Sequence, residues 1–221
     1  MSTGGTQLVL FDLDGTLADT YPDLLAAVHN AFLEQGLPAP DPALVGAQIS
    51  HGGRAMINAA LTAPVPEVQF KLILDRFLQL YREQICVHTR LFPGMSEVLA
   101  QIEQLGMKWG VVTNKRSWLT EPLIDQLHLR QRLACLVSGD SAARAKPHPD
   151  TLLMALQQST CCAGESLYVG DAHNDGRAAR AVGMRAVVAN YGYIDANENT
   201  LDWQADGYIN TPLDLLDWLD K

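Results

Sequence analysis

The sequence is most constrained at residues 8–17, which read LVLFDLDGTL. Four apolar residues, typical of a buried strand, run directly into Asp12 and Asp14, and Gly15 then permits a sharp turn. Because side chains alternate along an extended chain, the two carboxylates point to one side and Leu13 to the other. Burying two carboxylates is too costly for an ordinary core, so a cation, a proton or a substrate is expected between them.

Two simpler interpretations of this stretch compete with a functional site. A strand that ends in a polar Asp-Gly turn needs no ligand at all. A calcium-binding loop is disfavoured, because its twelfth position is Asp23 rather than Glu and Pro22 precedes it. Three polar fragments later in the chain favour a functional site, namely VVTNK at 111–115, AKPHP at 145–149 and YVGDAHND at 168–175.

The segment 22–90 has the apolar spacing of helices. Apolar residues recur every three or four positions over 24–32 and again over 70–81, and prolines interrupt the sequence between these runs. No strand is predicted in this segment. It is expected to be a small helical domain inserted behind the first strand, with hinges near 19–22 and 91–94.

From residue 93 onward, helical and strand patterns alternate. The expected helices are 95–105, 118–127, 150–158, 176–182 and 213–219, and the expected strands are 108–113, 133–137, 166–169, 185–189 and one near Tyr208. This order predicts an α/β fold with a doubly wound, Rossmann-like parallel sheet. The α/β core would comprise 1–20 and 91–221, and the helical cap 21–90. Ligands bind at the carboxyl ends of the strands in such sheets, so the four polar fragments are expected to form one site.

The charge and cysteine content restrict the partners that this chain can have. A net charge of −9 over 221 residues argues against nucleic acid or an anionic membrane surface. No apolar stretch approaches membrane-spanning length, and no basic leader precedes an apolar run. The four cysteines lack disulfide or metal spacing, which favours reduced thiols in a cytoplasmic protein. The oligomeric state stays open.

The four polar fragments together resemble the signature motifs of the haloacid dehalogenase superfamily, in its phosphatase branch. A carboxylate is ionised near pH 7, so Asp12 needs no base to become a nucleophile. The resemblance implies that Asp12 attacks phosphorus and forms an aspartyl phosphate. It implies that Asp14 is the general acid for the leaving alcohol and then the general base for water.

The resemblance also implies a Mg²⁺ ion, for which hard oxygen ligands are suited. Its ligands would be the side chain of Asp12, the backbone carbonyl of Asp14 and the side chain of Asp171. Asp175 would support the metal and its waters. Taken alone, the sequence Gly170-Asp171 is equally typical of a strand-to-helix turn with an acidic cap.

The transferring phosphoryl group would be bound by Thr113, Asn114 and Lys146. Thr113 closes a strand and places a hydroxyl, followed by the backbone amide of Asn114, where phosphoryl oxygens would lie. Lys146 provides a compact positive charge before a proline. Each of these residues, taken singly, would more often be an ordinary strand end or a solvated surface side chain. Lys115 and Arg116 are interpreted as surface charges that lead into a helix.

The segment His51-Gly-Gly-Arg54 in the helical insert is the candidate for substrate specificity. Gly53 permits close approach of the backbone, and Arg54 is suited to bind a carboxylate. An ordinary loop before a helix explains the same residues equally well. His173, between the two acids of the last motif, is expected to be a solvent-facing loop side chain.

Further segments narrow the resemblance to the phosphoglycolate phosphatase-like group. TLADT at 16–20, followed by a helical insert, resembles that group as a whole. Five segments look like those of N-acetylmuramic acid 6-phosphate phosphatases: 50–56, 86–88, 91–95, 109–115 and 191–194. One departure is Ala172-His173, where those relatives commonly carry other polar residues.

These resemblances imply a Mg²⁺-dependent phosphomonoester hydrolase that works through an aspartyl phosphate. Its substrate would be a small phosphate ester with a carboxylate, either N-acetylmuramic acid 6-phosphate or 2-phosphoglycolate. Both carry the carboxylate, so Arg54 does not distinguish them. A phosphosugar mutase of the same superfamily would use the same two aspartates, and a non-catalytic binding protein on this scaffold is a third interpretation.

Overall fold

The computed structural model describes residues 5–219, and a parallel sheet of six strands forms its centre. The strand order is β5-β4-β1-β6-β7-β8, so the strand that carries the first acidic motif lies in the interior of the sheet. Every neighbouring pair is parallel. The strands are β1 Leu8–Phe11, β4 Lys108–Val112, β5 Cys135–Val137, β6 Ser166–Gly170, β7 Arg185–Ala189 and β8 Gly207–Ile209. The predicted doubly wound parallel sheet is therefore confirmed.

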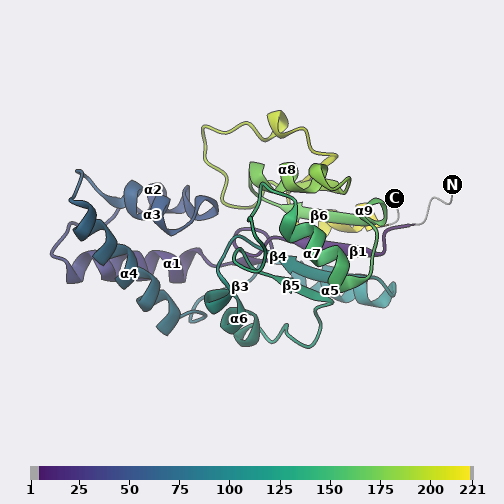
Figure 1. The fold of residues 1–221 in the computed structure, drawn as a ribbon, viewed down its shortest axis with the longest axis horizontal. Helices are drawn as coiled ribbons and strands as arrows, with labels where there is room; N and C mark the ends of the chain where they lie inside the picture. Colours follow the sequence, from purple (N-terminus) through teal and green to yellow (C-terminus); the bar gives the residue numbers. More distant parts are fainter. Residues whose placement is uncertain (1–4, 220–221) are drawn as a thin grey trace.

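Helices cover both faces of this sheet (Figure 1). Leu8 and Leu10 of β1 belong to the core that contains residues of α7 (Asp150–Ser159) and α8 (His173–Ala181). Val9 and Phe11 belong to the opposite core, with residues of α5 (Met95–Gln104) and α6 (Ser117–Gln126). All four side chains of β1 are fully buried, as is typical of a parallel strand with both faces covered.

Short 3₁₀ turns account for the remaining elements of this part of the chain. They are η2 Ala163–Glu165, η3 Thr200–Trp203 and η4 Pro212–Leu215. The helix expected at 213–219 is divided into η4 and α9 Leu216–Leu219. α8 begins at His173, earlier than expected, where the carboxylate of Asp175 accepts a hydrogen bond from the N–H of Ala172 at 3.0 Å.

Four helices form the segment between the first acidic motif and α5. They are α1 Tyr21–Glu34, α2 Pro42–Gly46, α3 Gly53–Ala60 and α4 Glu67–Glu83, with the 3₁₀ turn η1 Ile49–His51 before α3. α1 and α4 pack along each other, and α2 and α3 lie against them, to the left of the sheet in Figure 1. Proline at the start of α1 and the Asp41 side chain at the start of α2 mark two helix beginnings.

The two segments that join these helices to the sheet lie side by side. β2 (Ala18–Asp19) pairs antiparallel with β3 (Arg90–Leu91), and Asp19 lies opposite Arg90. The sequence predicts no strand in 22–90, whereas β3 begins at Arg90. The prediction is therefore wrong at this residue. A strand of two residues is too short for its pattern to be recognised. In the described part of the chain, no helix has the length and apolar character needed to cross a membrane.

Asp23 links α1 to the segment that returns from α4. Its buried carboxylate accepts from the N–H of His88 at 2.9 Å, and from the N–H and hydroxyl of Thr89 at 2.8 and 2.7 Å. These bonds connect the two ends of the helical segment close to β2 and β3.

Removing this carboxylate is predicted to destabilise the protein. Asp23→Ala leaves three donors without their acceptor, two of them on the buried Thr89, and is expected to lower the free energy of unfolding by about 2–4 kcal/mol. Urea unfolding followed by tryptophan fluorescence measures this loss. Asp75→Ala, at an exposed position of α4, is the matched control and should change the value by less than about 0.5 kcal/mol. Equal effects of the two substitutions would contradict the structural role of Asp23.

Candidate active site

Asp12 lies at the carboxyl end of β1, where the backbone still follows the pairing of the sheet. Its N–H donates to the carbonyl of Val169 at 2.9 Å. One of its carboxylate oxygens accepts from the N–H of Leu13 at 2.7 Å. The residue is only 8% exposed, so its carboxylate requires positive charge nearby.

Lys146 provides positive charge at this position. Its ammonium lies 3.1 Å from a carboxylate oxygen of Asp12 and 2.7 Å from one of Asp175. It also donates to the hydroxyl of Tyr168 at 2.7 Å and to the carbonyl of Val112 at 3.0 Å. The lysine side chain is 1% exposed, so its ammonium is held in place by these four acceptors rather than by solvent.

Asn114 holds the backbone of Lys146. Its side-chain oxygen accepts from the N–H of Lys146 at 3.0 Å, and its side-chain nitrogen donates to the carbonyl of Lys146 at 2.9 Å. Thr113, at the end of β4, is buried, and its hydroxyl accepts from the N–H of Lys115 at 3.2 Å. The structure thus places Thr113, Asn114 and Lys146 together, and their contact with a phosphoryl group stays a prediction.

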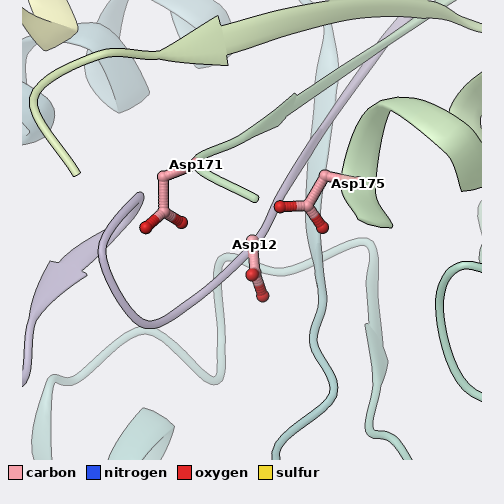
Figure 2. A group of neighbouring side chains, drawn as sticks. All are labelled: Asp12, Asp171 and Asp175. Atoms are coloured by element: carbon pink, nitrogen blue, oxygen red, sulfur yellow. The ribbon is translucent and has the colours of Figure 1, made fainter. Parts of the chain in front are cut away.

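Asp12, Asp171 and Asp175 bring three carboxylates to one place (Figure 2). Asp12 follows β1, Asp171 follows β6, and Asp175 lies in the first turn of α8. One oxygen from each lies within 4.8 Å of the others, and all three residues are buried. The carboxyl ends of β1 and its neighbour β6 therefore meet at this group, as expected for a parallel sheet.

Asp171 is held by donors from three separate parts of the chain. The hydroxyl of Thr16 donates to it at 2.8 Å, the N–H of Tyr193 at 2.9 Å and the hydroxyl of Ser50 at 3.1 Å. Gly15 passes so close, with φ of 81°, that a Cβ atom at that position would overlap the Asp171 carboxylate. Ser50 belongs to η1, so the helical segment reaches directly into the acidic group.

The carboxylates are buried with too little positive charge beside them. Burial raises the pKa of Asp12 to about 6, with Asp175 and Asp14 adding to the rise and Lys146 opposing it. Burial likewise raises the pKa of Asp171 to about 8, and the charges of Asp12 and Asp175 add to it. One ammonium does not balance three acids, so the group favours a further cation.

The donor set fits a small divalent cation. All three side chains offer carboxylate oxygen, which Mg²⁺ prefers, and they come from different elements to lie close to one another. Asp12 and Asp171 are two of the ligands expected from the sequence. Asp175 belongs to this group and also to the ion pair with Lys146. One of its oxygens accepts from the Lys146 ammonium at 2.7 Å.

The structure corrects the interpretation of Lys115 as a surface charge. Its side chain is 7% exposed, and its ammonium donates to both carboxylate oxygens of Asp14 at 2.8 and 2.9 Å. The hydroxyl of Thr20 donates to the same carboxylate at 2.7 Å. The sequence places Lys115 before a helix, where a solvated lysine is common, and the ion pair forms only when β1 and β4 lie side by side. Arg116 is exposed, as expected.

Comparison with known proteins agrees with this geometry. Residues 9–189 match the model of the haloacid dehalogenase-like hydrolase family. The chain belongs to that family. Its sequence is 39% identical to an N-acetylmuramic acid 6-phosphate phosphatase of Pseudomonas putida, over 96% of each chain, and 40% identical to a phosphoglycolate phosphatase of Xanthomonas campestris, over 94% of this chain and 93% of the relative.

A solved structure shows the same fold over nearly the whole length. The crystal structure of a "predicted phosphoglycolate phosphatase" from Haemophilus somnus superposes with a TM-score of 0.87, at 28% identity and over 98% of each chain. The predictions of superfamily, fold and enzyme class, a phosphatase of the haloacid dehalogenase superfamily, are confirmed by these similarities.

Within this hydrolase, Arg54 and Gly53 have local packing partners. The Arg54 side chain is 60% exposed, lies 3.4 Å from a carboxylate oxygen of Glu67 and covers the ring of Phe70. A Cβ atom at Gly53 would lie 3.0 Å from the ring of Phe77, so this glycine lets α3 pack closely against α4. Their predicted part in substrate specificity stays a prediction.

Three residues that contact Asp171 were not expected from the sequence, namely Thr16, Ser50 and Tyr193. The only signal for them is indirect, because each lies in a segment that resembles the relatives. His173 is exposed, as expected, but it begins α8 and stacks on Trp203 with ring centroids 5.9 Å apart.

The raised pKa values of Asp12 and Asp171 predict how pH affects the metal-free hydrolase. Both carboxyl groups hold protons in the folded state at pH values where the unfolded chain, with pKa near 4, has lost them. The folded state therefore binds more protons than the unfolded chain between about pH 4 and 8. The free energy of unfolding is expected to fall as the pH rises through this window.

Asp171→Asn tests this, because the amide does not ionise. With a chelator present, it should raise the free energy of unfolding by at least about 1 kcal/mol at pH 8, and by less at pH 5. Urea unfolding at the two pH values measures both differences. A variant less stable than the parent at pH 8 would show that the carboxylate is not under this repulsion.

Proposed function

We propose that this chain is a Mg²⁺-dependent phosphomonoester hydrolase that acts through an aspartyl phosphate on a small phosphate ester bearing a carboxylate. The observation that carries the proposal is the convergence of Asp12, Asp171, Asp175 and Lys146 at the carboxyl edge of the sheet. This arrangement offers a buried nucleophile, a fixed positive charge and a set of oxygen ligands in one place.

The division of the chain follows from the same site. We infer that residues 1–20 and 91–221 form the catalytic core and that 21–90 form a cap, although 1–4 and 220–221 lie outside the described residues. The hydrogen bond from the Ser50 hydroxyl to Asp171 supports this division, because a cap that covers the site would contact the acidic group. β2 and β3 would be the hinge strands.

The first step begins with Asp12. A carboxylate oxygen of Asp12 forms a bond to phosphorus as the ester P–O bond breaks, and the leaving oxygen takes a proton from Asp14. Lys146 would offset the negative charge of the transferring phosphoryl oxygens, and the hydroxyl of Thr113 would donate to one of them. Asn114 acts through Lys146, because it holds the lysine backbone on both sides.

The second step returns the enzyme to its starting state. Asp14 accepts a proton from water, the water oxygen attacks phosphorus, and the bond between phosphorus and Asp12 breaks to release inorganic phosphate. A Mg²⁺ ion bound by Asp12, the backbone carbonyl of Asp14 and Asp171 would neutralise charge on the phosphate. Thr16, Tyr193 and Ser50 orient the Asp171 carboxylate for this.

The relatives suggest the substrate class. N-acetylmuramic acid 6-phosphate and phosphoglycolate, which appear in the names of proteins about 40% identical to this chain, are both phosphate esters that carry a carboxylate. Phosphate release from these two esters, measured side by side with Mg²⁺ present, tests the proposal. If the protein released phosphate from neither ester, this substrate class would be ruled out.

The nucleophile is tested by Asp12→Asn. The amide has nearly the same shape but does not attack phosphorus, so the rate of phosphate release is expected to fall by at least about 10⁴-fold. Circular dichroism should show an unchanged fold. Asp75→Asn, which removes an exposed carboxylate of α4, is the matched control. Turnover by Asp12→Asn at the rate of the parent would eliminate Asp12 as the nucleophile.

The metal is tested by removing it. Excess chelator is expected to abolish phosphate release, because the buried carboxylates then repel the phosphate dianion, and added Mg²⁺ should restore it. Chelator already saturated with Mg²⁺ is the control for effects of the chelator itself. Full activity in excess free chelator would be incompatible with a metal-dependent reaction.

A further inference from the structure

Lys115 is a second buried cation near the site, and the mechanism above does not use it. It extends from the loop after β4 to the junction between the sheet and the helical segment. Its ammonium bonds both oxygens of Asp14 and lies 4.7 Å from the ring centroid of Tyr81, a buried residue of α4. Lys115 therefore contacts both the proposed general acid and the proposed cap.

This ion pair fixes the orientation of the Asp14 carboxylate, because both of its oxygens accept from the same ammonium. Lys115 donates to both of them, and Thr20 donates to one of them as well. As the general acid, Asp14 has to carry a proton on one of these oxygens and turn it toward the leaving oxygen, which separates that oxygen from the Lys115 ammonium. That separation would leave a buried ammonium against an aromatic ring without a counter-ion, which is strongly unfavourable.

A carboxylate on the substrate would remove this cost, because it has the same charge and shape as the group it replaces. We propose that Lys115 is the specificity-determining residue that binds the carboxylate of the substrate, and that this carboxylate takes the place of Asp14 on Lys115. The inference rests on the proposed function. It adds a reason for the substrate class, since a carboxylate would both bind the enzyme and release Asp14 for proton transfer.

Two other cations, Lys146 and Arg54, are less suited to this task. Lys146 already has four acceptors, among them Asp12 and Asp175, and its side chain is 1% exposed. Arg54 is 60% exposed and is directed to Glu67 and Phe70 within the helical segment. Neither contact involves Asp14, so neither residue would couple recognition of a carboxylate to release of the acid.

Matched pairs of substrates test the inference. N-acetylmuramic acid 6-phosphate is compared with the derivative whose lactyl carboxylate is converted to a carboxamide, and 2-phosphoglycolate with 2-hydroxyethyl phosphate, so that the carboxylate of each pair is replaced by an uncharged group of similar size. In the parent, kcat/KM should be at least about tenfold higher for the ester with the carboxylate in a pair that is hydrolysed. Lys115→Met should reduce this ratio to about one to three, with kcat on the carboxylate ester falling as well as KM rising. Lys115→Arg, which keeps a cation, should retain part of the ratio.

Lys71→Met is the matched control, because it removes a lysine from an exposed position of α4 and should keep the parental ratio. If the parent had the same kcat/KM for both members of a pair, the inference would be overturned before any variant was measured. It would also be overturned if Lys115→Met lowered kcat/KM equally for both members of a pair, or if Arg54→Met rather than Lys115→Met removed the preference. If the parent released phosphate from none of the four esters, the proposed function itself would fail.

Discussion

The ammonium of Lys146 lies between the carboxylates of Asp12 and Asp175, and the carboxylate of Asp171 completes the group. Most of the nearby structure serves to hold these charges in place. Asn114 binds the lysine backbone from both sides, and Tyr168 offers its hydroxyl from the neighbouring strand. A buried group with an excess of negative charge is costly, and a bound cation would offset that cost.

The parallel sheet makes this group possible because it brings the ends of distant segments together. β1, β4 and β6 are neighbours, so residues that lie far apart in the sequence end at one edge. Glycine allows the close approach. A Cβ atom at Gly15 would overlap Asp171, and one at Gly170 would overlap Asp175. The same edge is where doubly wound sheets bind their ligands, for the same geometric reason.

The helical segment is tied to this group at several points. Ser50 donates to Asp171, and the ring of Tyr81 lies beneath the ammonium of Lys115. Tyr193, on the loop after β7, donates to the carboxylate of Asp19 at 2.6 Å and accepts from the N–H of Tyr21 at 2.9 Å, next to the paired strands β2 and β3. A substrate that changes these contacts would therefore change how the helical segment sits on the sheet.

The sequence by itself determined the alternation of strands and helices, the helical insert, and the four polar fragments whose residues meet at the sheet edge. These are local patterns, because a buried strand, a helix periodicity and an Asp-x-Asp turn are each written within about ten residues. Only the tertiary structure decided the partners of Lys115, Ser50 and Tyr193. Each of these side chains is bound by residues distant in the sequence, and the energy of a buried ion pair or hydrogen bond depends on burial and distance, which local sequence does not encode.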